Sequence, residues 1–103
     1  ALYGAWQKIV PVNKASKNRV LTYDVVGPIC ESADFIGKDR SLDIKQHDLL
    51  AIKSAGAYGF VMSSNYNSRP RAPEVMVNGS DVHLIRKREA TEDLFRNEYL
   101  LPI

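Results

Sequence analysis

The residues best suited to chemistry in this sequence gather around its single cysteine. Cys30 is followed directly by Glu31 and Ser32, and it comes just after a Gly27-Pro28 pair. A thiol can give a proton to a carbanion as a general acid. The adjacent carboxylate of Glu31 would favour the protonated thiol, which suits proton donation better than nucleophilic attack. Cys30 is therefore a candidate proton donor, although a lone cysteine is more often a buried apolar side chain.

Glu31 and two tyrosines are further candidates. Glu31 could bind a substrate ammonium group, and the alternative is a solvated loop carboxylate. Tyr58 stands in the run Ala55-Gly56-Ala57-Tyr58-Gly59, whose small residues let a ligand or another backbone come close. Its hydroxyl could meet a phosphate and its ring a planar cofactor, whereas the alternative is a core tyrosine on a strand. Tyr3 has no local context by which to judge it.

Other kinds of site have no support in the sequence. His47 and His83 lack ligand-like spacing and the cysteine stands alone, so we expect no metal site. Neither a GxGxxG motif nor a P-loop is present. The net charge is only +2, and a solvated strand end explains the basic run at residues 86–88 better than a phosphate-binding patch. No apolar stretch approaches the length of a membrane span.

The elements that must position these residues are mainly β-strands. Apolar and β-branched runs predict strands over residues 6–12, 19–26, 49–53, 74–77 and 81–85. Pro11 would place the first strand at a sheet edge or a bulge. The second strand should be largely buried. The last two strands should form a hairpin across Asn78-Gly79-Ser80, because Asn-Gly supplies the positive φ values of tight turns.

The remaining segments are predicted to be loops and one helix. Residues 28–40 fit neither a helix nor a strand period, so we expect a long loop that carries candidate residues. Residues 65–73 contain two prolines and should also be loop. Thr91 can N-cap a short helix that ends near Tyr99. The 103 residues, 45% of them hydrophobic, therefore predict one β domain over residues 1–103, a barrel or sandwich with a short C-terminal helix.

Several motifs follow one another along the chain, namely Ala1-Leu2-Tyr3-Gly4-Ala5, Gly27-Pro28-Ile29-Cys30-Glu31-Ser32-Ala33-Asp34, Lys38-Asp39-Arg40, Ala55-Gly56-Ala57-Tyr58-Gly59-Phe60 and Ser64-Asn65-Tyr66-Asn67-Ser68-Arg69-Pro70. Taken in this order, they closely resemble the diaminopimelate decarboxylase family. Together they cover nearly the whole chain. Ornithine decarboxylases are similar in this domain but carry Asp-Gly after the cysteine. The pair Glu31-Ser32 therefore favours diaminopimelate.

The resemblance implies an enzyme dependent on pyridoxal 5'-phosphate, of the alanine-racemase-like fold type. Such an enzyme converts meso-2,6-diaminopimelate to L-lysine and CO2 in lysine biosynthesis. Each subunit has an N-terminal (β/α)8 barrel and a C-terminal β domain, and the sites form at the interface of a homodimer. The lysine that binds the cofactor covalently lies in the barrel. We therefore expect this chain, which lacks the barrel and an initiator methionine, to be the C-terminal β domain, inactive alone.

The same resemblance assigns roles to individual residues. Cys30 would be the proton donor and would enter the partner subunit's site. Glu31 would bind the substrate from the same loop, at its distal amine. Tyr58 would contact cofactor and substrate, and Tyr3 would help to hold the distal carboxylate. We expect a cytoplasmic enzyme that binds neither nucleic acid nor membranes. The alternatives are another pyridoxal-dependent decarboxylase of basic amino acids, and a non-catalytic homologue that acts as an interaction module.

Overall fold

The computed structural model describes residues 4–13, 19–30 and 32–103, which belong to two compact units. The first unit is Ala1–Met62 and the second is Ser63–Ile103. Strands and short 3-10 helices make up the regular structure of the described residues, which confirms the predicted mainly β class. Closure into a barrel or sandwich, and a single domain over residues 1–103, stay predictions. In the described part of the chain, no helix is long and apolar enough to cross a membrane.

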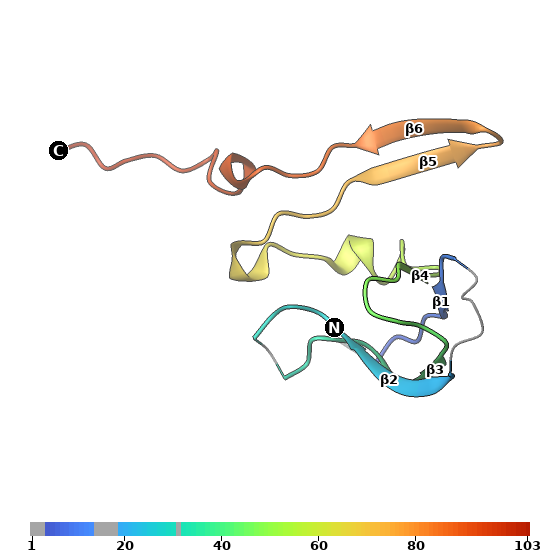
Figure 1. Cartoon of the computed structure of the whole chain (residues 1–103). Helices are drawn as coiled ribbons and strands as arrows, with labels where there is room; N and C mark the ends of the chain where they lie inside the picture. Colours follow the sequence, from blue (N-terminus) through green and yellow to red (C-terminus); the bar gives the residue numbers. More distant parts are fainter. Residues whose placement is uncertain (1–3, 14–18, 31) are drawn as a thin grey trace. The chain divides into compact units, whose positions relative to one another are not determined.

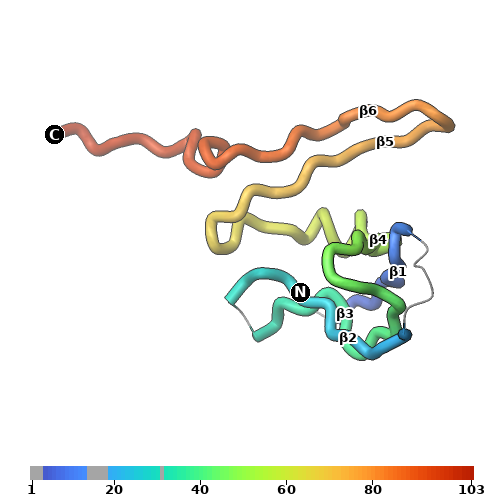
Figure 2. Tube along the Cα trace, viewed as in Figure 1, coloured from blue at the N-terminus to red at the C-terminus, as the bar shows by residue number. Residues whose placement is uncertain are grey.

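The described residues of the first unit form four strands in two antiparallel pairs (Figure 1). These strands are β1 Ile9–Pro11, β2 Leu21–Val26, β3 Phe35–Leu42 and β4 Leu50–Ile52. β1 pairs with β4, and β2 pairs with β3. The hairpin of β2 and β3 is thus nested in the sequence between the two strands of the outer pair, as the trace in Figure 2 shows.

Strand β3 corrects the prediction of a loop over residues 28–40. Two residues of β3, Lys38 and Asp39, stand opposite the single residue Asp24 of β2. Asp39 has a left-handed φ of 52°, and its N–H donates to Oδ1 of Asp24 at 3.0 Å. A bulge of this kind breaks the alternation of side chains along a strand. The regular alternation of side chains that predicts a strand is therefore absent from this segment of the sequence, although the strand is present.

The predicted burial of the second strand is wrong. Leu21 and Val26, on β2, are 45% and 55% exposed, because each sheet of the described residues has only two strands and leaves a face uncovered. Ile9 and Leu42 are the buried hydrophobic side chains of the described residues. A Cβ on Gly37 would lie 2.8 Å from Cδ1 of Ile9. Glycine at this position therefore allows β1 to pack closely on β3.

The outer pair confirms the first and third predicted strands, with shorter limits. Pro11, the last residue of β1, pairs with Leu50 of β4. Among the described residues this sheet has two strands, so β1 is an edge strand. The chain enters β4 through a turn over residues 45–48. In that turn the N–H of Lys45 donates to Oδ2 of Asp48 at 2.9 Å, and His47 takes a positive φ of 73°.

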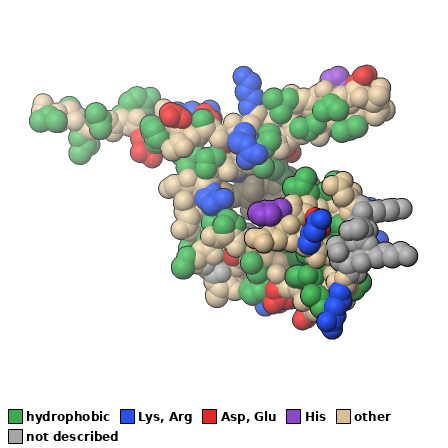
Figure 3. All heavy atoms as spheres, in the orientation of Figure 1, with side chains coloured by type: hydrophobic (Ala, Val, Ile, Leu, Met, Phe, Trp, Pro, Cys, Tyr) green, Lys and Arg blue, Asp and Glu red, His purple; other side chains and the backbone are tan. Residues whose placement is uncertain are grey.

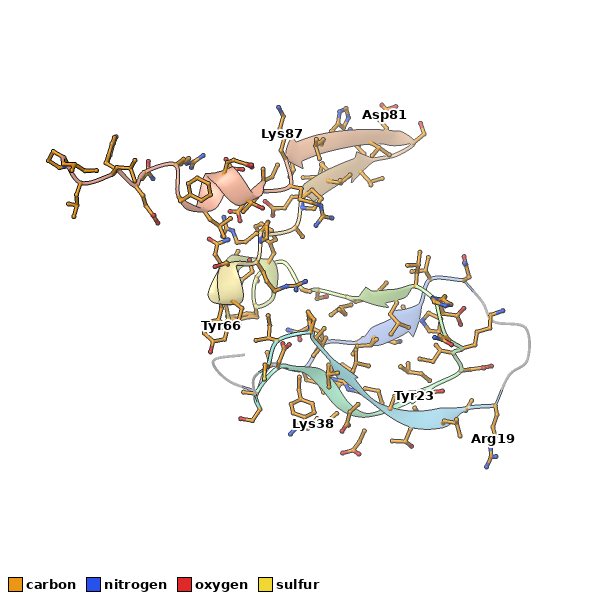
Figure 4. All side chains as sticks on the ribbon, turned by 60° about the vertical axis from the view of Figure 1, so that its left-hand side comes forward. Arg19, Tyr23, Lys38, Tyr66, Asp81 and Lys87 are labelled. Atoms are coloured by element: carbon orange, nitrogen blue, oxygen red, sulfur yellow. The ribbon has the colours of Figure 1, made fainter. Side chains whose placement is uncertain are left out.

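The second unit confirms the predicted hairpin. Strands β5 Glu74–Asn78 and β6 Asp81–Arg86 pair antiparallel, and Asn78 faces Asp81 across a two-residue turn. Of the described turn residues, Gly79 alone has a positive φ, of 61°, which fits a type II′ turn. In the space-filling view (Figure 3), hydrophobic side chains lie along this hairpin among polar ones. Figure 4 labels Asp81 at the turn and Lys87 just after β6.

In the part of the chain that the structure describes, the helical segments are all short 3-10 turns, namely η1 Phe60–Met62, η2 Tyr66–Ser68 and η3 Thr91–Leu94. The prediction of a helix from Thr91 to about Tyr99 is wrong in its length. The N-cap is Ala90 rather than Thr91, and the N–H of Ala90 donates to Oδ2 of Asp93 at 2.8 Å. The acidic first turn favours a helix start, but after Leu94 the chain forms a turn over residues 95–97 and has no regular structure over residues 98–103.

Candidate functional site

Cys30 lies in the connection of the β2–β3 hairpin. The last strand pair before this connection is Val26 with Phe35. Cys30 is a free and exposed cysteine, so the alternative of a buried apolar side chain is wrong for this structure. An exposed thiol on a connection between two paired strands can reach a bound molecule, which a core cysteine could not.

The same connection is held by a residue that our sequence reasoning did not single out. The backbone N–H of Gly27 donates to the carbonyl of Asp34 at 3.0 Å. The carboxylate of Asp34 turns back into the connection, where Oδ2 accepts the N–H of Ile29 at 2.8 Å. The sequence did contain a signal for this role, an aspartate that follows a Gly-Pro pair, because aspartate commonly accepts backbone N–H groups in turns. Asp34 thus fixes the backbone just before Cys30.

Among the described residues of this unit, two cationic side chains lie over aromatic rings. On β3, Nζ of Lys38 stands 4.0 Å from the centre of the Phe35 ring. Figure 4 labels Lys38 on this ribbon, and Tyr23 on its partner strand. Farther along β3, the guanidinium of Arg40 lies 4.4 Å from the Trp6 ring, and its Nη1 donates to the carbonyl of Gln7 at 2.8 Å. Arg40 therefore ties the segment before β1 to the hairpin that carries Cys30.

Tyr58 lies in a compact turn after β4. The N–H groups of Phe60 and Val61 donate to the carbonyls of Ala55 and Gly56, at 2.7 and 3.1 Å. A Cβ on Gly59 would collide with the Ala55 carbonyl, so the turn closes this tightly because residue 59 is glycine. Tyr58 is 59% exposed and outside any strand, and the alternative of a core strand tyrosine is wrong.

Two of the four candidate residues, Glu31 and Tyr3, lie outside the described residues. The other two, Cys30 and Tyr58, belong to separate loops of the first unit, after β2 and after β4. Over the described ranges, no group of three or more His, Cys, Asp or Glu side chains could hold a metal ion.

The motif at residues 64–70 is anchored in the second unit by Glu89. Oε2 of Glu89 accepts from Nδ2 of Asn65 and from the N–H of Arg71, each at 2.7 Å. Its Oε1 is 3.1 Å from Nε of Arg71. The backbone N–H of Arg71 and the Asn65 amide lower the pKa of the Glu89 carboxyl below its ordinary value, because both donate to the charged form. The ring of Tyr66 projects from this segment in Figure 4.

The turn around Tyr58 fits a phosphate-bearing planar cofactor. None of the described atoms outside its chain neighbours lies within 4 Å of the place where a Cβ on Gly56 would stand. The flanking Ala55 and Ala57 are small, and the phenol of Tyr58 is exposed beside them. A small-residue surface next to a hydroxyl donor allows close approach by a ring and a hydrogen bond to phosphate.

Comparison with known families adds an independent finding. The sequence model described as "Pyridoxal-dependent decarboxylase, C-terminal sheet domain" matches residues 1–56. The diaminopimelate decarboxylase of Vibrio cholerae is 54% identical over 102 residues, which cover 99% of this chain and 24% of that protein. The diaminopimelate decarboxylase of Pseudomonas aeruginosa is also 54% identical, over 99% of this chain. The chain thus spans about a quarter of the length of the curated relatives it matches.

Solved structures agree with the sequence relatives. The diaminopimelate decarboxylase of M. jannaschii in co-complex with L-lysine superposes with a TM-score of 0.87 at 38% identity, covering 98% of this chain and 23% of that one. The Helicobacter pylori diaminopimelate decarboxylase complexed with L-lysine gives a TM-score of 0.83 at 43% identity, covering 94% and 24%. The arrangement of strands is therefore that of the C-terminal part of these enzymes.

Proposed function

This chain belongs to the pyridoxal-dependent decarboxylases, as their C-terminal sheet domain, and from that premise we propose that it completes the active site of a diaminopimelate decarboxylase. The full enzyme would convert meso-2,6-diaminopimelate to L-lysine and CO2. This chain would supply the proton donor and substrate contacts. The observation that carries the proposal is the exposed Cys30, held on a fixed loop within a motif of the family.

The cofactor of the proposed reaction is pyridoxal 5'-phosphate. When bound, it takes up the electron pair that CO2 leaves behind. The carbon that lost CO2 must then gain a proton, and the thiol of Cys30 would give it. Tyr58, beside the open Cα of Gly56, would contact the cofactor and orient the substrate. The lysine that holds the cofactor would lie outside this chain.

The remaining partners belong to the same proposal. Glu31 would hold the distal ammonium of the substrate, and Tyr3 its distal carboxylate. A (β/α)8 barrel domain would carry the cofactor, and a homodimer would bring Cys30 to the site of the partner subunit. We place the enzyme in the cytoplasm, without nucleic-acid or membrane partners. Support for these points comes from the family membership of the chain and the names of its relatives.

The test of this function is a substrate panel on the full-length enzyme that contains this domain. We expect CO2 release from meso-diaminopimelate, with L-lysine as product, and at least a hundredfold lower kcat/KM for L-ornithine and L-arginine. A site built to bind a distal carboxylate is left with unpaired polar groups when the substrate lacks that carboxylate. Such unpaired groups can lower kcat/KM by about 10⁴-fold. The 103-residue chain alone should release no CO2, with or without added cofactor.

Two outcomes would contradict the proposal. Equal kcat/KM for ornithine and diaminopimelate would make the enzyme a different decarboxylase of basic amino acids. Absence of decarboxylation by the full-length protein, with the cofactor bound as judged by absorbance, would favour a non-catalytic homologue. A useful control is the same panel on the H. pylori enzyme, a structural neighbour named for this activity.

A further inference from the structure

The connection between β2 and β3 contains two residues that differ in burial and in role. Asp34 is half-buried, whereas Cys30 is exposed. Asp34 makes two contacts to this connection, its carbonyl to the N–H of Gly27 and its Oδ2 to the N–H of Ile29, at 3.0 and 2.8 Å. A carboxylate that accepts a backbone N–H forms a charge-assisted bond, stronger than the bond between two neutral groups.

Gly27 provides the space for this contact. A Cβ on Gly27 would stand against the Asp34 carboxylate, 2.5 Å from Oδ1 and 2.6 Å from Cγ. Any side chain at residue 27 would therefore displace the carboxylate from its position over the glycine. Glycine at 27 and aspartate at 34 act together, and their joint effect is on the backbone of Ile29.

Ile29 immediately precedes the candidate proton donor. Consecutive Cα atoms are 3.8 Å apart, so a shift of the Ile29 backbone moves Cys30 by a comparable amount. Misplacement of a catalytic group by about 1 Å can lower the rate about a hundredfold. A bond that fixes Ile29 therefore bears directly on proton transfer.

We propose that Asp34 is a positioning residue for proton delivery, holding the backbone of Ile29 so that the Cys30 thiol faces the carbon that has lost CO2. Asp34 acts through the loop and does not itself touch the substrate. Gly27 is its necessary counterpart. The inference rests on the proposed function, because it requires Cys30 to be the proton donor.

The test compares three variants of the full-length enzyme with bound cofactor. Asp34→Ala should lower kcat by about tenfold to a hundredfold with KM changed less than twofold, because the thiol is misplaced while the substrate contacts remain. Asp34→Asn keeps an acceptor oxygen of similar geometry and should retain kcat within about threefold. Gly27→Ala leaves the carboxylate in the protein but displaces it, and should resemble Asp34→Ala.

Two readouts separate positioning from a general structural defect. In D2O, the wild type should place deuterium on one face of the reacting carbon, and Asp34→Ala should give a mixture of both faces as water replaces the thiol. In a Cys30→Ala background, Asp34→Ala should cause no further loss of kcat, since the two changes affect one step.

Each outcome decides something specific. If Cys30→Ala leaves kcat intact, the proton-donor role fails and the inference fails with it. If Cys30→Ala slows the enzyme but Asp34→Ala and Gly27→Ala do not, only the inference is overturned. Equal losses for Asp34→Ala in both backgrounds would also overturn it. Should Asp34→Ala fail to fold, the stereochemistry given by Gly27→Ala decides.

Discussion

The chain contains two hairpins that differ in how their strands are joined. In β2–β3, residues 27–34 form a long connection, and bulges interrupt the register. In β5–β6, Gly79 and Ser80 alone separate the paired residues Asn78 and Asp81. The first hairpin carries the thiol and a carboxylate that holds its backbone, whereas the second ends in a minimal turn. Register shifts occur in both hairpins, so the difference between them is the length of the connection: the long one has room for the thiol and the carboxylate, and the two-residue turn has none.

The largest expected effect concerns the tips of the two hairpins. Cys30→Ala in the full-length enzyme should lower kcat by about a hundredfold or more, because general acid catalysis is worth about 10²–10⁴-fold. Ser80→Ala, at the tip of the other hairpin, should leave kcat unchanged. Steady-state kinetics with meso-diaminopimelate measure both. Similar losses for the two variants would mean that the tips do not differ in function.

The second effect compares one arginine from each hairpin. Arg40 is half-buried and bonds the Gln7 carbonyl over the Trp6 ring, so Arg40→Met should weaken local stability by about 2 kcal/mol. Amide exchange in residues 6–9 should then be about thirtyfold faster. Arg86 pairs with Glu74 at the surface, where Arg86→Met should cost about 0.5 kcal/mol.

Hydrogen–deuterium exchange with mass spectrometry of the full-length enzyme measures this pair of variants. Peptides covering residues 6–9 and 74–86 report on the two sites separately. Faster exchange around β5–β6 in Arg86→Met than around β1 in Arg40→Met would reverse the comparison. Arg40→Lys is the matched control, because it keeps the charge but loses the planar geometry that stacks on a ring.

A smaller effect is expected from Gly79. Its φ of 61° disfavours any side chain, so Gly79→Ala should destabilise the β5–β6 hairpin by about 1 kcal/mol. Amide exchange in residues 74–86 should rise about fivefold, with kcat unchanged. A fall in kcat as large as that of Gly27→Ala would show that the second hairpin also affects catalysis.

The smallest effect is a pH dependence in the second unit. The Arg71 N–H and the Asn65 amide lower the pKa of Glu89 from its ordinary 4.5, so its contribution to stability is present above that value. The contribution is lost as the pH falls through the lowered pKa of the folded state. At pH 7, Glu89→Gln should increase exchange in residues 64–71, and the difference from the wild type should shrink as the pH falls through the lowered pKa of Glu89. A difference that does not change with pH would contradict this.

The sequence predicted the hairpins unequally, for physical reasons. The β5–β6 hairpin keeps a regular register from Val75 to Asn78, and Asn78-Gly79 predicts its turn, although Gly79 alone of these two takes a positive φ. Strand β3 was missed because Lys38 and Asp39 share one partner, which removes the alternation on which sequence reasoning depends. Burial of β2 was overestimated, since hydrophobic strands predict a covered face whether or not one is present.

The candidate site was predicted in part. Cys30 and Tyr58 are exposed on loops, which residue types alone could not establish, since both are more often core residues. The roles of Cys30, Glu31, Tyr58 and Tyr3 all stay predictions. Asp34 was part of a motif, but its bond to Ile29 depends on the backbone of the connection, which spacing does not specify.

The nesting of β2–β3 inside β1–β4 has a consequence for the order of folding. The pair Pro11 with Leu50 joins residues about forty positions apart, whereas Val26 and Phe35 are close in sequence. Closing a short loop costs less entropy than closing a long one, and hairpins form in about 1–10 μs. The inner hairpin should therefore form first and shorten the span that the outer pair must close. The loop that carries Cys30 would thus form before β1 pairs with β4.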